Sequence, residues 1–200
     1  MKKIVIATSN PHKVEEISAV LGRLGIECVP LPNAGIPEPV EDGATFEANA
    51  RIKARAYAKA LGTTVLADDS GLEVDALGGA PGVHSAYYAG TGANRAERDA
   101  ANNARLLREL EGVPDGRRGA RFVCVLSLAA ADGSIEAEAR GTFEGHIGHA
   151  PRGTNGFGYD PLLVLGDGRT SAELSSDEKN ARSHRGNALR ALVRLIQASR

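Results

Sequence analysis

The opening of the chain constrains its fold most strongly, because a short apolar run is followed directly by a segment with helical spacing. The run from Lys2 to Thr8 ends at Ser9-Asn10-Pro11, where asparagine can cap a helix and proline fits its first position. Apolar residues then recur every three or four positions up to Gly25, and a second apolar run starts at Ile26. This pattern predicts a strand, a helix and a second strand in succession.

The rest of the chain continues the alternation and adds a hairpin. Helical spacing predicts helices over 46–61, over 94–111 and at the C-terminus, while short apolar runs predict strands over 63–67 and 161–165. Long apolar segments on either side of Asp132-Gly133 give a strong hairpin signal. Crossover units together with a hairpin predict the α/β class (mixed α+β), with a mixed sheet flanked by helices in a single domain over 1–200.

Composition argues against several classes of function. With 24 basic and 25 acidic residues the net charge is −1, whereas proteins that bind nucleic acid usually have a basic excess. We therefore expect no nucleic-acid partner and only local recognition of phosphate. The apolar runs are too short for a membrane span or a signal peptide, which predicts a cytoplasmic protein with no membrane partner. Cys28 and Cys124 lack metal-site spacing and are predicted to be buried thiols.

The segment "TSNPHK" is a candidate phosphate-binding turn. A strand that ends at a helix N-terminus presents free backbone N–H groups and the positive end of the helix dipole, which attract phosphate. Thr8, Ser9 and Asn10 add donors, and Lys13 adds a charge that the dipole alone would disfavour. An anionic ligand would resolve that conflict. The competing interpretation is an ordinary capped turn with a solvated lysine.

The segment "LADDSG" places two adjacent aspartates at the predicted end of an apolar strand, where open α/β sheets bind their ligands. Neighbouring strand residues point to opposite faces, so Asp68 and Asp69 are expected to play different roles. One of them could bind Mg²⁺ or activate water, helped by a loop acid such as Glu41. The competing interpretation is an Asx-type turn before Gly71.

The segment "SSDEKNARSHRG" gathers three potential donors near a helix. Ser175 and Glu178 have the spacing of a capping box, which needs no function to explain it. Lys179, His184 and Arg185 could bind phosphate or contact a base. A solvated basic face is the ordinary alternative.

The segment "NGFGYDP" places aromatic residues among glycines, in a chain with only four Phe, four Tyr and no Trp. Phe157 is the candidate to stack on a flat base, Gly158 would let the backbone approach it, and Asp160 would offer an acceptor to the ring edge. The sequence leaves open whether Tyr159 faces a purine or the core.

These motifs in this order resemble the inosine triphosphate pyrophosphatase-like family, whose members hydrolyse non-standard purine nucleoside triphosphates. The resemblance covers essentially the whole chain, through the segments "ATSNPHK", "EDGATFEANARIKA", "LADDSGLEVDALGGAPGVHSA", "ARFVCVLSLA", "GTNGFGYDP" and "AELSSDEKNARSHRG". It implies an elongated mixed sheet with helices forming two lobes around a central cleft, a homodimer, and Mg²⁺-dependent cleavage of ITP, dITP or XTP to the monophosphate and pyrophosphate.

The resemblance also implies roles for individual residues. Asp69 would be the general base and a magnesium ligand, and Glu41 the acidic metal-linked residue, with Glu38, Asp42 and Glu47 as nearby alternatives. The substrate would be bound by three groups of residues. The triphosphate would be bound by Thr8, Ser9, Asn10, Lys13 and Ser70. The purine would be framed by Phe157, Gly158, Tyr159 and Asp160. Recognition of base and phosphate would be completed by Lys179, His184 and Arg185.

Two other functions fit the same motifs. One is a pyrophosphatase of similar fold that acts on modified pyrimidine or methylated nucleotides. The other is a nucleotide sensor without catalysis. The paired acids favour an enzyme over a sensor, because they would repel a triphosphate unless a metal ion joined them.

Overall fold

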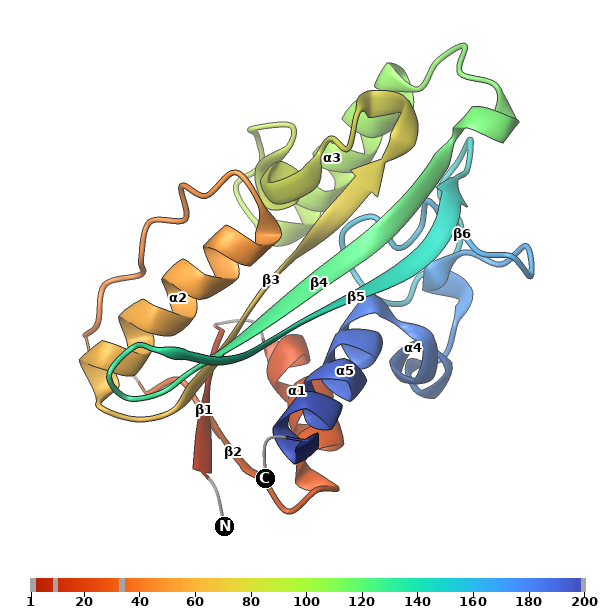
Figure 1. Cartoon of the computed structure of the whole chain (residues 1–200). Helices are drawn as coiled ribbons and strands as arrows, with labels where there is room; N and C mark the ends of the chain where they lie inside the picture. Colours follow the sequence, from red (N-terminus) through yellow and green to blue (C-terminus); the bar gives the residue numbers. More distant parts are fainter. Residues whose placement is uncertain (1–2, 9–10, 33–34, 199–200) are drawn as a thin grey trace. The chain divides into compact units, whose positions relative to one another are not determined.

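The computed structural model describes residues 3–8, 11–32 and 35–198 (Figure 1). The predicted site residues Ser9 and Asn10 lie outside this described part. The strands are β1 (Lys3–Ala7), β2 (Glu27–Pro30), β3 (Val65–Val74), β4 (Gly119–Ala129), β5 (Ile135–Ile147) and β6 (Leu163–Val164). The α-helices are α1 (Pro11–Gly22), α2 (Phe46–Leu61), α3 (Arg95–Glu109), α4 (Ser176–Arg182) and α5 (His184–Ala198). Short 3₁₀ helices are η1 (Asp75–Leu77), η2 (Gly82–Tyr87), η3 (Asp115–Arg117) and η4 (Ser171–Glu173).

The strands form one mixed sheet in the order β2-β1-β3-β4-β5-β6. β1 runs parallel to β2 and β3, whereas β5 and β6 are antiparallel, so the predicted α/β class with a mixed sheet and flanking helices is confirmed. The chain divides into two compact units, one of 1–69, 124–142 and 183–200 and one of 70–123 and 143–182. We refer to them as unit 1 and unit 2. The single domain, the elongated shape and the central cleft stay predictions.

Unit 1 has helices on both faces of its strands. Alternate residues of β1 and β3 enter two different core clusters, because side chains alternate across a strand. Ile6 and Leu66 pack in the cluster that contains residues of α1 and α5, which lie side by side (Figure 1). Val65 and Ala67 pack instead with Ala54 of α2. Even-numbered residues of β3 near position 66 therefore face α1 and α5, and odd-numbered ones face α2.

β3 is longer than the sequence pattern indicates. The strand was expected to end at Ala67, with Asp68-Asp69 at its end, but it continues to Val74. The aspartates therefore lie inside the strand, and the predicted placement at a strand end is wrong. Leu72 and Val74 are fully buried on alternate positions beyond them, and their burial holds this part of the chain extended. Residues 68–71 are polar or glycine, so the sequence pattern does not predict that the strand continues through them.

Unit 2 has its own core and a buried arginine inside it. Leu72 of β3, Leu106 of α3 and Phe122 of β4 meet in one cluster. Arg118 is only 2% exposed beside it. Its guanidinium donates to main-chain carbonyl oxygens, among them those of Ile147 at 2.7 Å, Leu110 at 2.8 Å and Gly148 at 3.0 Å. The side chain thereby ties the end of α3 to the end of β5.

Replacing Arg118 by methionine is expected to lower the free energy of unfolding by about 3 kcal/mol, because buried carbonyl oxygens would lose a charged donor without gaining water. Urea denaturation followed by circular dichroism measures the change. Arg117→Met is the matched control at an exposed neighbouring position and should cost less than about 0.5 kcal/mol. Equal effects of the two substitutions would contradict the role of the buried guanidinium.

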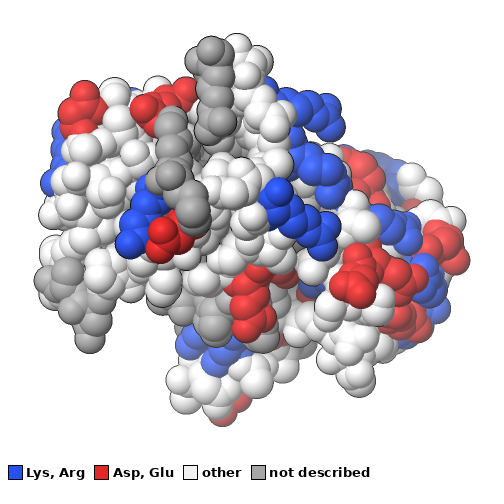
Figure 2. Space-filling model, turned by 90° about the horizontal axis from the view of Figure 1, so that it is seen from below, with Lys and Arg blue, Asp and Glu red and all other residues white. Residues whose placement is uncertain are grey.

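No helix in the described part of the chain is long and apolar enough to cross a membrane. On the face drawn in Figure 2, acidic and basic side chains are interspersed among neutral ones. This pattern agrees with a net charge of −1.

Candidate active site

The adjacent aspartates of β3 point to opposite faces of unit 1, as the strand alternation predicts. Asp68 shares the face of Leu66 and meets α1 and α5, whereas Asp69 shares the face of Ala67 and meets α2. Asp68 is 2% exposed and Asp69 is partly buried. The two carboxylates therefore have different partners, and their chemistry differs accordingly.

The Asp68 carboxylate forms ion pairs with two cations, which lie on different helices. The Lys13 ammonium of α1 lies 2.7 Å from its carboxylate, and the Arg185 guanidinium of α5 lies 3.9 Å from it. Arg185, itself 2% exposed, also pairs with Glu16 of α1. Burial by itself would raise the pKa of Asp68, but the charges of Lys13 and Arg185 outweigh it and hold the pKa far below its usual value. Asp68 is thus a fixed anion that positions the two cations.

For Asp69, the effect of burial on the pKa outweighs the effect of the neighbouring cations. Burial raises the pKa of its carboxyl to about 6, although the Lys53 charge and a hydrogen bond from Asn49 lower it. The nearby Glu41 carboxylate raises it further. A carboxylate with a pKa near neutrality can take a proton from water and is still ionised at pH 7. Asp69 therefore has the properties of a general base, and Asp68 does not.

Lys53 of α2 lies among the acidic residues Glu41, Asp68 and Asp69, and it was not assigned a role from the sequence. Its ammonium lies 2.9 Å from the Glu41 carboxylate and donates to the main-chain oxygen of Asp68 at 3.1 Å. Asn49, one helical turn earlier, is 4% exposed and accepts from the Gly43 amide at 2.8 Å. A signal was present in the sequence, because Asn49 and Lys53 stand on the apolar face of their helix. Polar residues on a buried helix face point to a site more often than those on an exposed face.

The residues present fit a divalent cation. No group of three or more His, Cys, Asp or Glu in the described ranges is placed to hold a metal ion by itself. Mg²⁺, however, needs only one or two carboxylates when substrate phosphates complete its shell. The Glu41 carboxylate is close enough to Asp69 for its charge to raise the pKa of Asp69. A cation between them would relieve this repulsion, so the donor set is suitable.

The other predicted site residues at the end of β1, in β3 and in α5 are partly or fully buried. Thr8 follows β1 directly, and Ser70 follows Asp69 inside β3; both are partly buried. His184 is the first residue of α5 and is 7% exposed. His184 and Arg185 are therefore not a solvated basic face, which was the competing interpretation. Arg185 reaches Glu16 and Asp68, which makes it a residue that orders the cluster.

A second group of predicted residues lies in unit 2, in the loop that contains "NGFGYDP". The Asp160 carboxylate organises this loop from a buried position, at 2% exposure. It accepts from the Phe157 amide at 2.8 Å and from the Ser171 hydroxyl at 2.7 Å, and it pairs with Lys179 of α4 at 2.5 Å. Gly156, with φ of +78°, has no room for a side chain, because a Cβ there would lie 2.1 Å from that carboxylate.

The three residues between Gly156 and Asp160 take different positions. Tyr159 packs in the core of unit 2 and donates its hydroxyl to the Ser85 carbonyl oxygen at 2.9 Å, which decides the question that the sequence left open. Phe157 remains partly exposed. The Gly158 amide donates to Asp99, and its carbonyl oxygen accepts from Asn103, both on α3. Phe157 is therefore the aromatic side chain of this loop that does not pack in the core.

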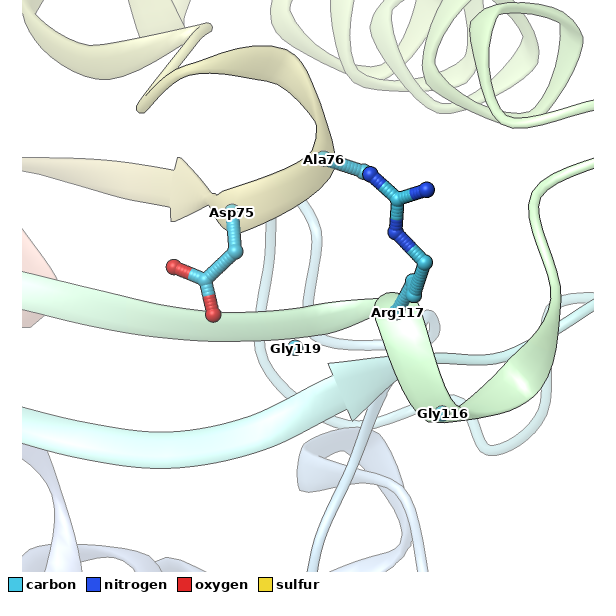
Figure 3. A pocket seen from close by; sticks show the side chains of 5 residues that line it. All are labelled: Asp75, Ala76, Gly116, Arg117 and Gly119. Carbon is cyan, nitrogen blue, oxygen red and sulfur yellow. The ribbon is translucent and has the colours of Figure 1, made fainter.

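Unit 2 also contains a pocket of about 240 Å³, at the ends of β3 and of the 3₁₀ turn η3 (Figure 3). It is lined by Asp75, Ala76, Gly116, Arg117 and Gly119. None of these residues was predicted to belong to the site, and the Asp75 carboxylate is already paired with Arg121 at 2.9 Å. We assign the pocket no role in the chemistry.

Comparison with known proteins decides the family. A model described as the Ham1 family matches residues 4–195. The chain belongs to the Ham1 family. A dITP/XTP pyrophosphatase from Exiguobacterium sibiricum is 53% identical over 95% of this chain and 94% of its own length. A protein of the same name from Anaeromyxobacter sp. is 48% identical over 97% and 96%.

Solved structures agree with this membership of the Ham1 family. A HAM1 protein from Coxiella burnetii is 42% identical and has a TM-score of 0.89 over 99% of this chain and 100% of its own. A nucleoside-triphosphatase named dITP/XTP pyrophosphatase from Mycobacterium abscessus is 47% identical, with a TM-score of 0.77 over 96% and 98%. The resemblance seen in the sequence motifs is therefore confirmed along the whole chain.

Proposed function

We propose that this Ham1-family protein hydrolyses dITP, ITP and XTP to the nucleoside monophosphate and pyrophosphate, which would remove these nucleotides before they enter DNA or RNA. The names of its relatives support this activity. The observation that carries the chemistry is the partly buried Asp69 carboxyl, with a pKa of about 6, beside the Lys53 ammonium. This arrangement suits a base that activates water at neutral pH.

In the proposed reaction Asp69 takes a proton from a water molecule, and the water oxygen attacks the α-phosphorus. The bond from that phosphorus to the bridging oxygen breaks, and pyrophosphate leaves with the bonding electrons. Lys13, held by Asp68 at 2.7 Å, and Lys53 would bind the negative charge of the triphosphate. Thr8, Ser9, Asn10 and Ser70 would add neutral donors to the phosphates.

Asp69 and Glu41 would hold Mg²⁺ together with the phosphate oxygens of the substrate. The cation would supply charge neutralisation at the triphosphate. The pairing of Glu41 with Lys53 at 2.9 Å favours Glu41 over Glu38, Asp42 and Glu47 for this role, because it places Glu41 in the same cluster as Asp69.

The residues of unit 2 would recognise the base. Phe157 would stack on the purine, with the Gly158 backbone close to it. Lys179 would act as a donor toward a 6-oxo group, which hypoxanthine and xanthine carry and adenine does not. Adenine would be rejected because two donors would then face each other unpaired. Asp160 would act through Lys179 and Phe157, which it holds. His184 and Arg185 would complete base and phosphate recognition.

We further propose a homodimer located in the cytoplasm.

A nucleotide panel tests this function. The protein is incubated with dITP, XTP, dATP, dGTP and dTTP, with and without Mg²⁺, and products are separated by ion-exchange chromatography. The expected result is monophosphate and pyrophosphate from dITP and XTP, with dATP and dGTP cleaved about 100-fold more slowly. Release of orthophosphate would contradict attack at the α-phosphorus. Binding of all these nucleotides without turnover would favour the sensor, and preferred cleavage of pyrimidines would favour the other pyrophosphatase.

A further inference from the structure

One arginine near the candidate base site is accounted for neither by the motifs nor by the proposed mechanism. Arg95, the first residue of α3, places its guanidinium carbon 4.3 Å from the centroid of the Phe157 ring. A cation in the first turn of a helix opposes the helix dipole, so helix stability does not explain it. The contact with the aromatic face is instead a cation–π interaction, which favours a cation at this position.

Arg95 belongs to a row of three residues on one face of α3. Arg95, Asp99 and Asn103 are spaced four apart, and all three contact Phe157 or Gly158. Asp99 accepts from the Gly158 amide at 2.8 Å, and Asn103 donates to the Gly158 carbonyl oxygen at 3.0 Å. These two residues fix the backbone beside Phe157, and Arg95 covers the ring itself.

A second cation faces the same ring. The Lys179 ammonium of α4 lies 5.3 Å from the Phe157 centroid. These contacts place four charged groups beside Phe157 and its backbone: Arg95 and Asp99 from α3, Lys179 from α4 and Asp160 from the loop. Asp99 accepts from the Gly158 amide, and Asp160 accepts from the Phe157 amide at 2.8 Å. Each ion pair therefore directs its carboxylate at the backbone and its cation at the ring.

The two cations differ in how firmly they are held. Lys179 is 12% exposed in its side chain and pairs with buried Asp160 at 2.5 Å. The Arg95 side chain is 46% exposed, and its distance to the Asp99 carboxylate is 3.8 Å, a weak contact between solvated groups. A flat ligand that stacks on Phe157 can therefore displace Arg95 at low cost, whereas Lys179 would stay in place.

We propose that Arg95 is a specificity-determining residue for the base. The purine takes the place of the guanidinium on Phe157, and the guanidinium then lies against the purine. Xanthine loses a ring proton near neutral pH because two ring carbonyls share the resulting charge, whereas hypoxanthine has one carbonyl and stays neutral. A site with Arg95 and Lys179 at the base therefore favours the xanthine anion over hypoxanthine. This inference rests on the proposed function, because it takes the Phe157 loop as the base site.

Equilibrium binding of the reaction products tests the proposal without turnover. Affinities for XMP and IMP are measured by calorimetry at pH 7.5 for the wild-type protein and for Arg95→Met, which keeps an apolar cover but removes the charge. The Kd of XMP is expected to rise about tenfold, a size between those of exposed and of desolvated cation–π contacts, and that of IMP by less than about threefold. Arg95→Lys should retain most of the preference for XMP.

Arg98→Met is the matched control, because Arg98 lies on the same helix but places its guanidinium over a different ring, 5.4 Å from the Tyr87 centroid. It should leave both affinities unchanged. An equal loss for XMP and IMP in Arg95→Met, or no loss at all, would overturn the role of the charge. Unchanged binding in a protein that hydrolyses dITP would refute only this inference, whereas specific XMP binding without hydrolysis would refute only the proposed activity.

Discussion

Asp69→Asn is expected to lower kcat for dITP by about 10² to 10⁴-fold while the affinity for the nucleotide changes by less than about threefold. Asparagine keeps the shape of the side chain and can still meet Asn49 and Lys53, but it cannot accept a proton from water. Steady-state kinetics with pyrophosphate detection gives kcat, and calorimetry with IMP gives the affinity.

Asp132→Asn is the matched control for this substitution, since Asp132 lies in the exposed turn between β4 and β5 and Asn-Gly is also a favoured hairpin turn. It should leave kcat unchanged. If Asp69→Asn retained more than about a tenth of wild-type kcat, the base would have to be another group, because the loss would fall below the usual range for a general base.

The same substitution should stabilise the metal-free protein. Because the pKa of folded Asp69 is about 6, above its ordinary value of 3.8, its contribution to stability is full in acid and is lost as the pH rises through 6. Above that pH the folded protein carries an unfavourable charge that asparagine removes. The free energy of unfolding in EDTA should rise on the order of 2 kcal/mol at pH 7.5, with no gain at pH 4. A loss of stability at pH 7.5 would show that the carboxylate is not desolvated.

The second large effect is expected for Asp68→Asn. This substitution leaves the Lys13 ammonium and the buried Arg185 guanidinium without their shared anion, and Glu16 alone cannot compensate both. Breaking a buried ion pair from one side costs about 3–5 kcal/mol. Urea denaturation should show a loss of that size, and the KM for dITP should rise because Lys13 is no longer held in place.

Glu16→Gln provides the comparison at the outer end of this network, where the carboxylate side chain is 20% exposed. It should cost less than Asp68→Asn, because Glu16 is the more exposed carboxylate and Arg185 keeps its contact with Asp68. The depressed pKa of Asp68 means that its contribution is present at every pH above the ordinary aspartate range and is lost only in stronger acid. Between pH 5 and 8 the effect of Asp68→Asn should therefore be constant. A loss that disappeared at pH 5 would contradict the ion-pair network.

Local signals in the sequence predicted most of the fold. Residues 46–61 form a helix as expected, because Thr45 caps its start and Gly62, with φ of +60°, ends it. The hairpin around Asp132-Gly133 is also present between β4 and β5. The predicted end of β3 was wrong, because a polar stretch inside a strand resembles a loop in the sequence. Only the burial of Leu72 and Val74 shows that the strand continues.

The candidate site was predictable in its residue types but not in its partners. The opposite roles of Asp68 and Asp69 follow from strand alternation, which depends only on sequence position. Lys53 was overlooked, because its meaning depends on α2 packing over Asp69. Arg185 was predicted to touch substrate, which stays a prediction, and its ion pairs with Glu16 and Asp68 could not be read from the sequence.

Sequence alone therefore determined most of the strands and helices, which chemical groups are present, and which family the chain resembles, since these depend on local spacing and motif order. Tertiary structure alone decided how the two carboxyl groups differ in their readiness to take up a proton. Asp68 and Asp69 are identical and adjacent in the chain, and only the helices packed on each face make one a fixed anion and the other a carboxyl with a pKa of about 6. Burial and neighbouring charge set a pKa, and both arise only on folding.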